Sequence, residues 1–116
     1  MITPYLSQQA INDFGLRFSN LKYSATLVDS TDTAFTVPGN AQRYKAVIKV
    51  SGPTWMALNV AAAIPAGGTF ASSTSELVNI SEEVGREVIV GDVIHFFAAT
   101  GTPDVSIYLY SMSSPN

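Results

Sequence analysis

His95 is the residue with the most reactive chemistry in this chain, because it could serve as a general base or as a metal ligand. It is the only histidine, and the sequence contains no cysteine that could share a metal ion with it. No Gly-x-Ser-x-Gly turn is present to supply a serine nucleophile. We therefore expect no catalytic site, no metal and no cofactor, and we expect His95 to lie in a core or an interface.

Two acidic groups have the composition of a calcium site. Glu82, Glu83 and Glu87 form one group, and Asp29 with Asp32 forms the other. Neither group has the ligand spacing of a calcium-binding EF-hand loop. We interpret the glutamates as a solvated acidic loop and the aspartates as part of a turn.

Three aromatic residues could form a surface for ligands. Trp55, Tyr108 and Tyr110 are flat side chains of the kind that stack on sugar rings, and tyrosine also offers a polar group. The two tyrosines alternate with apolar residues, so they should point away from the core. Outward aromatic side chains with few charges around them also suit a protein–protein contact, which is the interpretation we favour.

Charged residues are scarce. Only 13% of the 116 residues are charged, about half of the usual 25%, and 13 serines and 10 threonines supply polarity instead. The net charge of −3 argues against nucleic-acid binding. No apolar run approaches the ~20 residues of a membrane span, and the N-terminus lacks the pattern of a signal peptide. We expect one soluble domain, made in the cytoplasm, that contacts neither nucleic acid nor membrane.

Short apolar-alternating segments dominate the chain from Tyr23 onward. They predict strands over residues 23–27, 35–37, 44–50, 54–60, 86–90, 93–99 and 105–110. Residues 61–75 are irregular, and Gly91-Asp92 predicts a tight type II′ hairpin between two of the strands. The series indicates an all-β chain folded as an antiparallel β-sandwich of jelly-roll type, covering residues 21–116.

Residues 1–20 differ from this pattern and form an N-terminal arm or short helix. Ser7 can cap the helix start, and Gly15 would end it. Because two helical turns are marginal alone, we expect the arm to dock on another surface. The side chains assigned to that contact are Tyr5, Leu6, Ile11 and Phe14.

The predicted strand at 93–99 is apolar on both faces except for His95. Such a strand must be covered on both sides, by the N-terminal arm, by an adjacent loop or by another subunit. We favour a subunit contact, since the cores of interfaces are depleted in charge. We assign His95, Phe97, Tyr108 and Tyr110 to this oligomer or partner surface.

Charge is also uneven along the chain. Residues 1–60 carry a net charge of +2, and residues 61–116 carry −5. Two interpretations stay open: the asymmetry arises by chance, or it reflects head-to-tail contacts between copies, in which different patches meet.

Five segments of the chain share a pattern of strands and turns: Trp55-Met-Ala-Leu-Asn59, Ile64-Pro-Ala-Gly-Gly-Thr-Phe70, Ser75-Glu-Leu77, Val90-Gly-Asp-Val-Ile94 and Thr102-Pro-Asp-Val-Ser-Ile107. In this pattern the chain resembles small bacteriophage virion proteins of the head decoration, cement or fibre-base type. The resemblance implies a non-enzymatic β-sandwich, often trimeric, that binds the assembled capsid lattice. We therefore expect a homotrimer on the virion surface with the major capsid protein as its partner. A carbohydrate-binding module, or one associated with the fibre or tail, is the alternative.

Overall fold

The computed structural model describes residues 18–19, 21–65, 67–80 and 83–112, which form eight strands and no helix. The strands are β1 (Leu21–Thr26), β2 (Thr33–Thr36), β3 (Arg43–Val50), β4 (Thr54–Leu58), β5 (Glu76–Val78), β6 (Val84–Ile89), β7 (Val93–Phe97) and β8 (Asp104–Ser111). The predicted N-terminal arm and its contact residues Tyr5, Leu6, Ile11 and Phe14 lie outside the described residues. No helix that could cross a lipid bilayer occurs in the described part of the chain.

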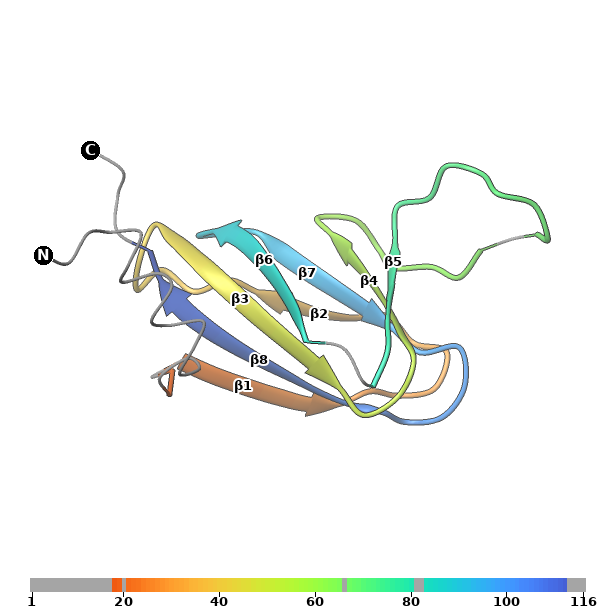
Figure 1. Ribbon diagram of the computed structural model, residues 1–116, viewed down its shortest axis with the longest axis horizontal. Helices are drawn as coiled ribbons and strands as arrows, with labels where there is room; N and C mark the ends of the chain where they lie inside the picture. Colours follow the sequence, from red (N-terminus) through yellow and green to blue (C-terminus); the bar gives the residue numbers. More distant parts are fainter. Residues whose placement is uncertain (1–17, 20, 66, 81–82, 113–116) are drawn as a thin grey trace, which may run out of the picture.

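The eight strands form two four-stranded antiparallel sheets (Figure 1). Sheet A has the order β1-β8-β3-β6, and sheet B has the order β2-β7-β4-β5. The first strand therefore pairs with the last, the second with the seventh, the third with the sixth and the fourth with the fifth. This is a long antiparallel ribbon rolled into two layers, which is the topology of a jelly roll. The predicted all-β jelly-roll sandwich is confirmed.

Alternation along each strand directs apolar side chains into the space between the sheets. In β8, Val105, Ile107 and Leu109 are buried, and the residues between them are more exposed. The same pattern in the other strands completes a single core, which includes Tyr44, Ala46, Ile48, Val50, Met56, Val78, Val88, Ile94 and Phe96.

Tyr44 has the largest fully buried side chain of the described residues, and it anchors the loop before β3. Its hydroxyl donates a hydrogen bond to the carbonyl oxygen of Pro38 at 2.9 Å and accepts one from the amide of Ala41 at 2.7 Å. The ring fills the core while the hydroxyl satisfies two backbone groups that would otherwise lack partners.

We expect Tyr44→Phe to lower the free energy of unfolding by about 1–2 kcal/mol, because the ring remains while the Pro38 and Ala41 groups lose their partner. Urea unfolding followed by fluorescence measures this change. Tyr108→Phe on the outer face of β8 is the matched control and should change stability by less than about 0.5 kcal/mol. Equal effects of the two substitutions would contradict the anchoring role.

The predicted hairpin at Gly91-Asp92 is wrong. The amide of Asp92 donates to the carbonyl oxygen of Ile89 at 3.1 Å, and Gly91 has a φ of 89° at the third position of this turn. Positive φ at that position is the mark of a type II turn. The turn carries the chain from β6 in sheet A to β7 in sheet B, so the two flanking strands do not pair with each other.

Different side-chain contacts join the two sheets at the two open edges of the sandwich. At the β1–β2 edge, the rings of Tyr23 and Phe35 lie 4.9 Å apart between their centroids. At the β5–β6 edge, Arg86 forms an ion pair with Glu76 across the two sheets. The register places both charged residues at inward positions, since Arg86 pairs with Ala46 and Glu76 pairs with Met56. Inward charges on edge strands are a known defence against pairing with further strands.

Candidate assembly surfaces

The outer face of sheet B is largely apolar. Trp55 pairs with Leu77 on one side and with Phe97 on the other, so these three side chains form a row across the sheet. Leu77 is 49% exposed, and the side chains of Trp55 and Phe97 are partly exposed. Ile94 and Phe96 of β7 are buried on the opposite face. The prediction that the strand beginning at residue 93 is apolar on both faces is therefore confirmed for β7.

An adjacent loop covers one end of this face. The carboxylate of Asp32 bridges two elements: one oxygen lies 2.7 Å from Nδ1 of His95, and the other accepts a hydrogen bond from the amide of Ala62 at 3.0 Å. Ala62 is buried, and so is the outward-facing Ala57. The sequence left three possible covers for this strand: the N-terminal arm, an adjacent loop or another subunit. Around His95, the cover is an adjacent loop. The row of Trp55, Phe97 and Leu77 remains at the surface.

The His95–Asp32 pair orients a loop. A histidine held by a carboxylate resembles part of a hydrolytic triad, which also requires a nucleophile on the other ring nitrogen. Here the second carboxylate oxygen is engaged by the Ala62 amide, and the imidazole side chain is only 19% exposed. Among the described residues, no group of three or more His, Asp or Glu side chains could hold a metal ion. The geometry accounts for His95 as an anchor for the segment around Ala62.

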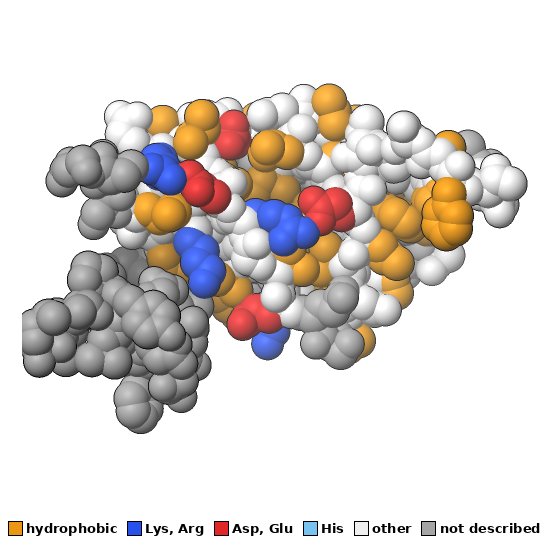
Figure 2. Space-filling view, turned by 45° about the horizontal axis from the view of Figure 1, so that its top comes forward, with side chains coloured by type: hydrophobic (Ala, Val, Ile, Leu, Met, Phe, Trp, Pro, Cys, Tyr) orange, Lys and Arg blue, Asp and Glu red, His pale blue; other side chains and the backbone are white. Residues whose placement is uncertain are grey.

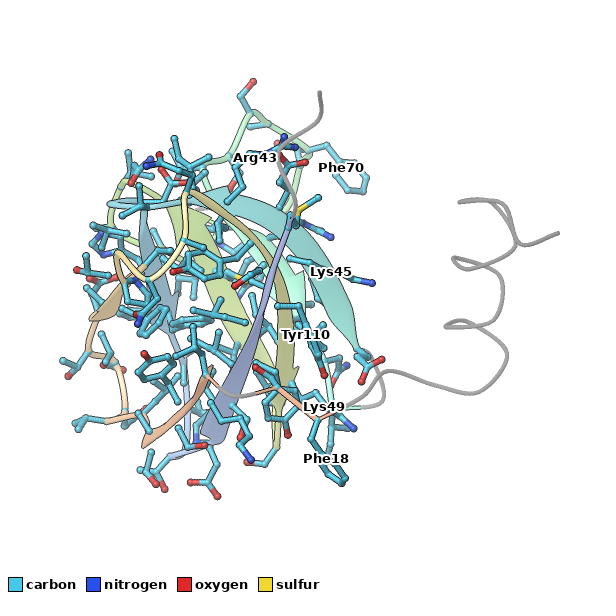
Figure 3. The ribbon with its side chains drawn as sticks, turned by 90° about the vertical axis from the view of Figure 1, so that its left-hand side faces the viewer. Phe18, Arg43, Lys45, Lys49, Phe70 and Tyr110 are labelled. Atoms are coloured by element: carbon cyan, nitrogen blue, oxygen red, sulfur yellow. The ribbon has the colours of Figure 1, made fainter. Side chains whose placement is uncertain are left out.

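The outer face of sheet A combines tyrosines with basic residues. Tyr108 lies between Lys22 of β1 and Val47 of β3, and Tyr110 pairs with Lys45. Figure 3 shows Arg43, Lys45, Lys49 and Tyr110 pointing away from the sandwich on the same side. Four of the five lysines and arginines in the described residues lie on this face, namely Lys22, Arg43, Lys45 and Lys49. We call it the tyrosine–lysine face.

Acidic residues offset only part of that positive charge. Glu87 forms an ion pair with Arg43, and the carboxylate of Asp104 accepts a hydrogen bond from Thr26 at 2.6 Å. Three lysines of the face have no ion pair within the described residues. A protein of net charge −3 therefore presents one locally positive face with aromatic side chains at its centre.

The structure separates residues that were assigned to one surface. Tyr108 and Tyr110 lie on the outer face of sheet A, whereas His95 and Phe97 lie on the outer face of sheet B. A single flat contact cannot include all four. Trp55 is also on sheet B, so Trp55, Tyr108 and Tyr110 do not form a common sugar-stacking platform.

The third surface is the long β4–β5 loop, residues 59–75, which projects beyond the ends of the strands (Figure 1). It contains no charged residue. Phe70 is fully exposed, and Val60 and Ile64 are about half exposed. Figure 2 shows apolar and neutral surface, without red or blue side chains, at this end of the visible face. The sequence analysis described this segment as irregular and did not assign it to a contact surface, although its length without charge was a usable signal.

Hydrogen bonds fix the neck of this loop. Asn59 has a positive φ of 61°, its amide donates to the carbonyl oxygen of Val93 at 2.7 Å, and its side-chain oxygen accepts from the Val93 amide at 2.8 Å. Further along, the amide of Ala63 donates to Oγ of Ser75 at 3.0 Å and joins the two arms of the loop. The loop therefore leaves the sandwich in a defined direction and presents Phe70 to solvent.

Comparisons of the chain with protein-family models, with curated proteins and with solved structures give no match.

Proposed function

We propose that this protein is a bacteriophage capsid decoration, or cement, protein that acts as a homo-oligomer and adds contacts between subunits of the assembled head. The observation that carries the proposal is the tyrosine–lysine face. Tyrosines bury a large area at little conformational cost and are enriched in protein contacts, and the lysines around Tyr108 suit an acidic partner surface. The partner proposed is an acidic region of the major capsid protein.

Decoration stabilises a head by mass action. A protein that binds the assembled shell and not the free subunits lowers the free energy of the shell by an amount that grows with occupancy. The lysines would speed the encounter with an acidic shell, and the tyrosines would hold the contact once formed. The N-terminal arm, with Tyr5, Leu6, Ile11 and Phe14, is proposed as a second anchor on the same shell.

A carbohydrate-binding role, at a fibre or tail position, is the second candidate. Tyr108 beside Lys22 offers a ring face with a neighbouring positive charge, which would suit an acidic sugar. This role places the same face against a glycan instead of a capsid protein.

Cryo-electron microscopy of particles made with and without this gene tests the location. We expect additional density of the size of one jelly-roll domain at symmetric positions on the head, present only when the gene is intact. Density confined to the tail or fibre would favour the second candidate. Absence of the protein from purified particles would contradict both.

Adding purified protein back to heads that lack it tests whether the tyrosine–lysine face binds the head. We expect Tyr108→Ser with Lys45→Glu to weaken binding about 100-fold, because a central aromatic contact and a charge attraction are both lost. Leu77→Ser on the opposite face is the matched control and should bind normally.

Removal of residues 1–16 should also weaken binding to the heads, and unchanged binding would eliminate the arm as an anchor.

A further inference from the structure

A cavity opens between the two sheets at the β5–β6 edge. Its volume is about 230 Å³, and apolar side chains from both sheets line its interior, among them Ile48, Met56, Leu58, Val88 and Ile94. Leu58 occupies an inward position of β4 but remains 49% exposed, since no side chain of the described residues fills the space beside it. The sandwich is therefore incompletely packed at this edge.

The charged residues at the cavity mouth are already paired. Glu76 binds Arg86, and Glu87 binds Arg43. The hydrogen bond from Arg86 to Glu76 raises the pKa of Arg86 above its ordinary value. Partial burial acts in the opposite direction and lowers this pKa by a smaller amount. A charged occupant would have to break one of these pairs, whereas a neutral apolar group would leave both in place. The site favours an uncharged apolar group.

The chain itself presents a group of that kind. Phe70 is the most exposed of the large apolar side chains described, and the loop that carries it has no charge over residues 59–75. Figure 3 shows Phe70 at the periphery of the molecule, pointing away from the sandwich. A cavity of about 150 Å³ is enough to hold benzene, so the space between the sheets can accept a phenyl ring.

We propose that Phe70 of one copy inserts into the inter-sheet cavity of a second copy, and that this is the self-contact of the homo-oligomer. The inference rests on the oligomer of the proposed function and identifies its interface. Every copy holds both halves of the contact, because Phe70 and the cavity belong to the same chain: Leu58 at the end of β4 and Thr74 near the end of the β4–β5 loop both line the cavity. A second copy is therefore the one partner in which the structure already supplies a fitting group.

The contact joins two different patches, so it is heterologous. Each copy gives one phenyl ring and receives one, and a closed ring of copies satisfies all of them. Burial of Phe70 and Leu58 would remove exposed apolar surface from water at each contact.

Sedimentation equilibrium at micromolar concentrations tests the contact with two variants. Phe70→Ala removes the inserted group, and Thr74→Trp obstructs the mouth from an exposed position without altering the core. We expect each variant to weaken self-association by about 30-fold or more. The matched controls are Phe18→Ala, which removes another highly exposed phenylalanine, and Thr100→Trp, at an exposed position outside the cavity lining. Both controls should associate like the unmodified protein.

Mixing the two variants provides the sharper test. Phe70→Ala retains an open cavity, and Thr74→Trp retains the phenyl ring, so an equimolar mixture should form heterodimers and no larger ring. If the mixture forms no heterodimers, the insertion of Phe70 into another copy is overturned. Insertion of Phe70 into the cavity of its own chain would give this result. If the unmodified protein is oligomeric and Phe70→Ala leaves it so, this inference fails while the proposed oligomer stands. A monomeric unmodified protein would contradict the oligomer itself.

Discussion

Replacing Phe96 with alanine should lower the free energy of unfolding by about 3–5 kcal/mol, the largest stability effect of any single substitution considered for this chain. Phe96 is 2% exposed and lies in β7, where it pairs with Thr33 of β2 and Met56 of β4. It faces the core from a strand flanked on both sides, so the surrounding backbone cannot move inward to fill the space. Domains of this size have total stabilities of about 5–15 kcal/mol, so the loss is a large fraction.

Urea denaturation at 25 °C measures this change, with Phe18→Ala as the control. Phe18 is 92% exposed, and its removal should change the free energy of unfolding by less than about 0.5 kcal/mol. The slope of the transition should be the same in both variants, which shows that the native state remains compact. A loss below about 1 kcal/mol for Phe96→Ala would be inconsistent with a core position.

The second large effect is expected at Gly91. Its φ of 89° belongs to the left-handed region, which a β-branched residue adopts only with strain. Apart from the two adjacent residues, no atom of the described residues lies within 4 Å of the position that a Cβ would occupy, so crowding by other parts of the fold does not contribute. Gly91→Val should therefore cost about 1–3 kcal/mol through the backbone alone.

Gly67 is the matched control for this substitution. It also has open space around the added Cβ, and its φ is not in the left-handed region. Gly67→Val should leave the midpoint of thermal unfolding nearly unchanged, whereas Gly91→Val should lower it by several degrees. Similar midpoints for the two variants would show that the turn between β6 and β7 accommodates valine by changing its conformation.

Alternation of apolar residues was sufficient to predict most of the strands. The long, regular β3 and β8 were predicted nearly to their ends, since each has an apolar residue at every second position. β5 was missed because it has only three residues, and its place beside β4 depends on a partner 20 residues away in the chain. Strand pairing is non-local, which is also why the Gly91 turn was taken for a hairpin.

The direction of surface side chains was predictable, but their grouping was not. Alternation correctly turned Tyr108 and Tyr110 outward, opposite the core residues of β8. Alternation could not show that Phe97 lies on the other sheet, since the assignment of a strand to a sheet depends on how the antiparallel ribbon folds into two layers. The contact of His95 with Asp32 joins residues 63 positions apart, and no local pattern predicts such a pair.

The position of β8 in sheet A also determines when the protein can fold. β8 lies between β1 and β3, yet it is the last of the eight described strands to be synthesised. Until residues 104–111 are available, β1 has no partner in its own sheet and β3 lacks one of its two neighbours. The jelly roll can therefore close only after β8 has been synthesised, with this long-range pairing as the slow event. A chain ending before β8 would expose the edges that the complete jelly roll pairs.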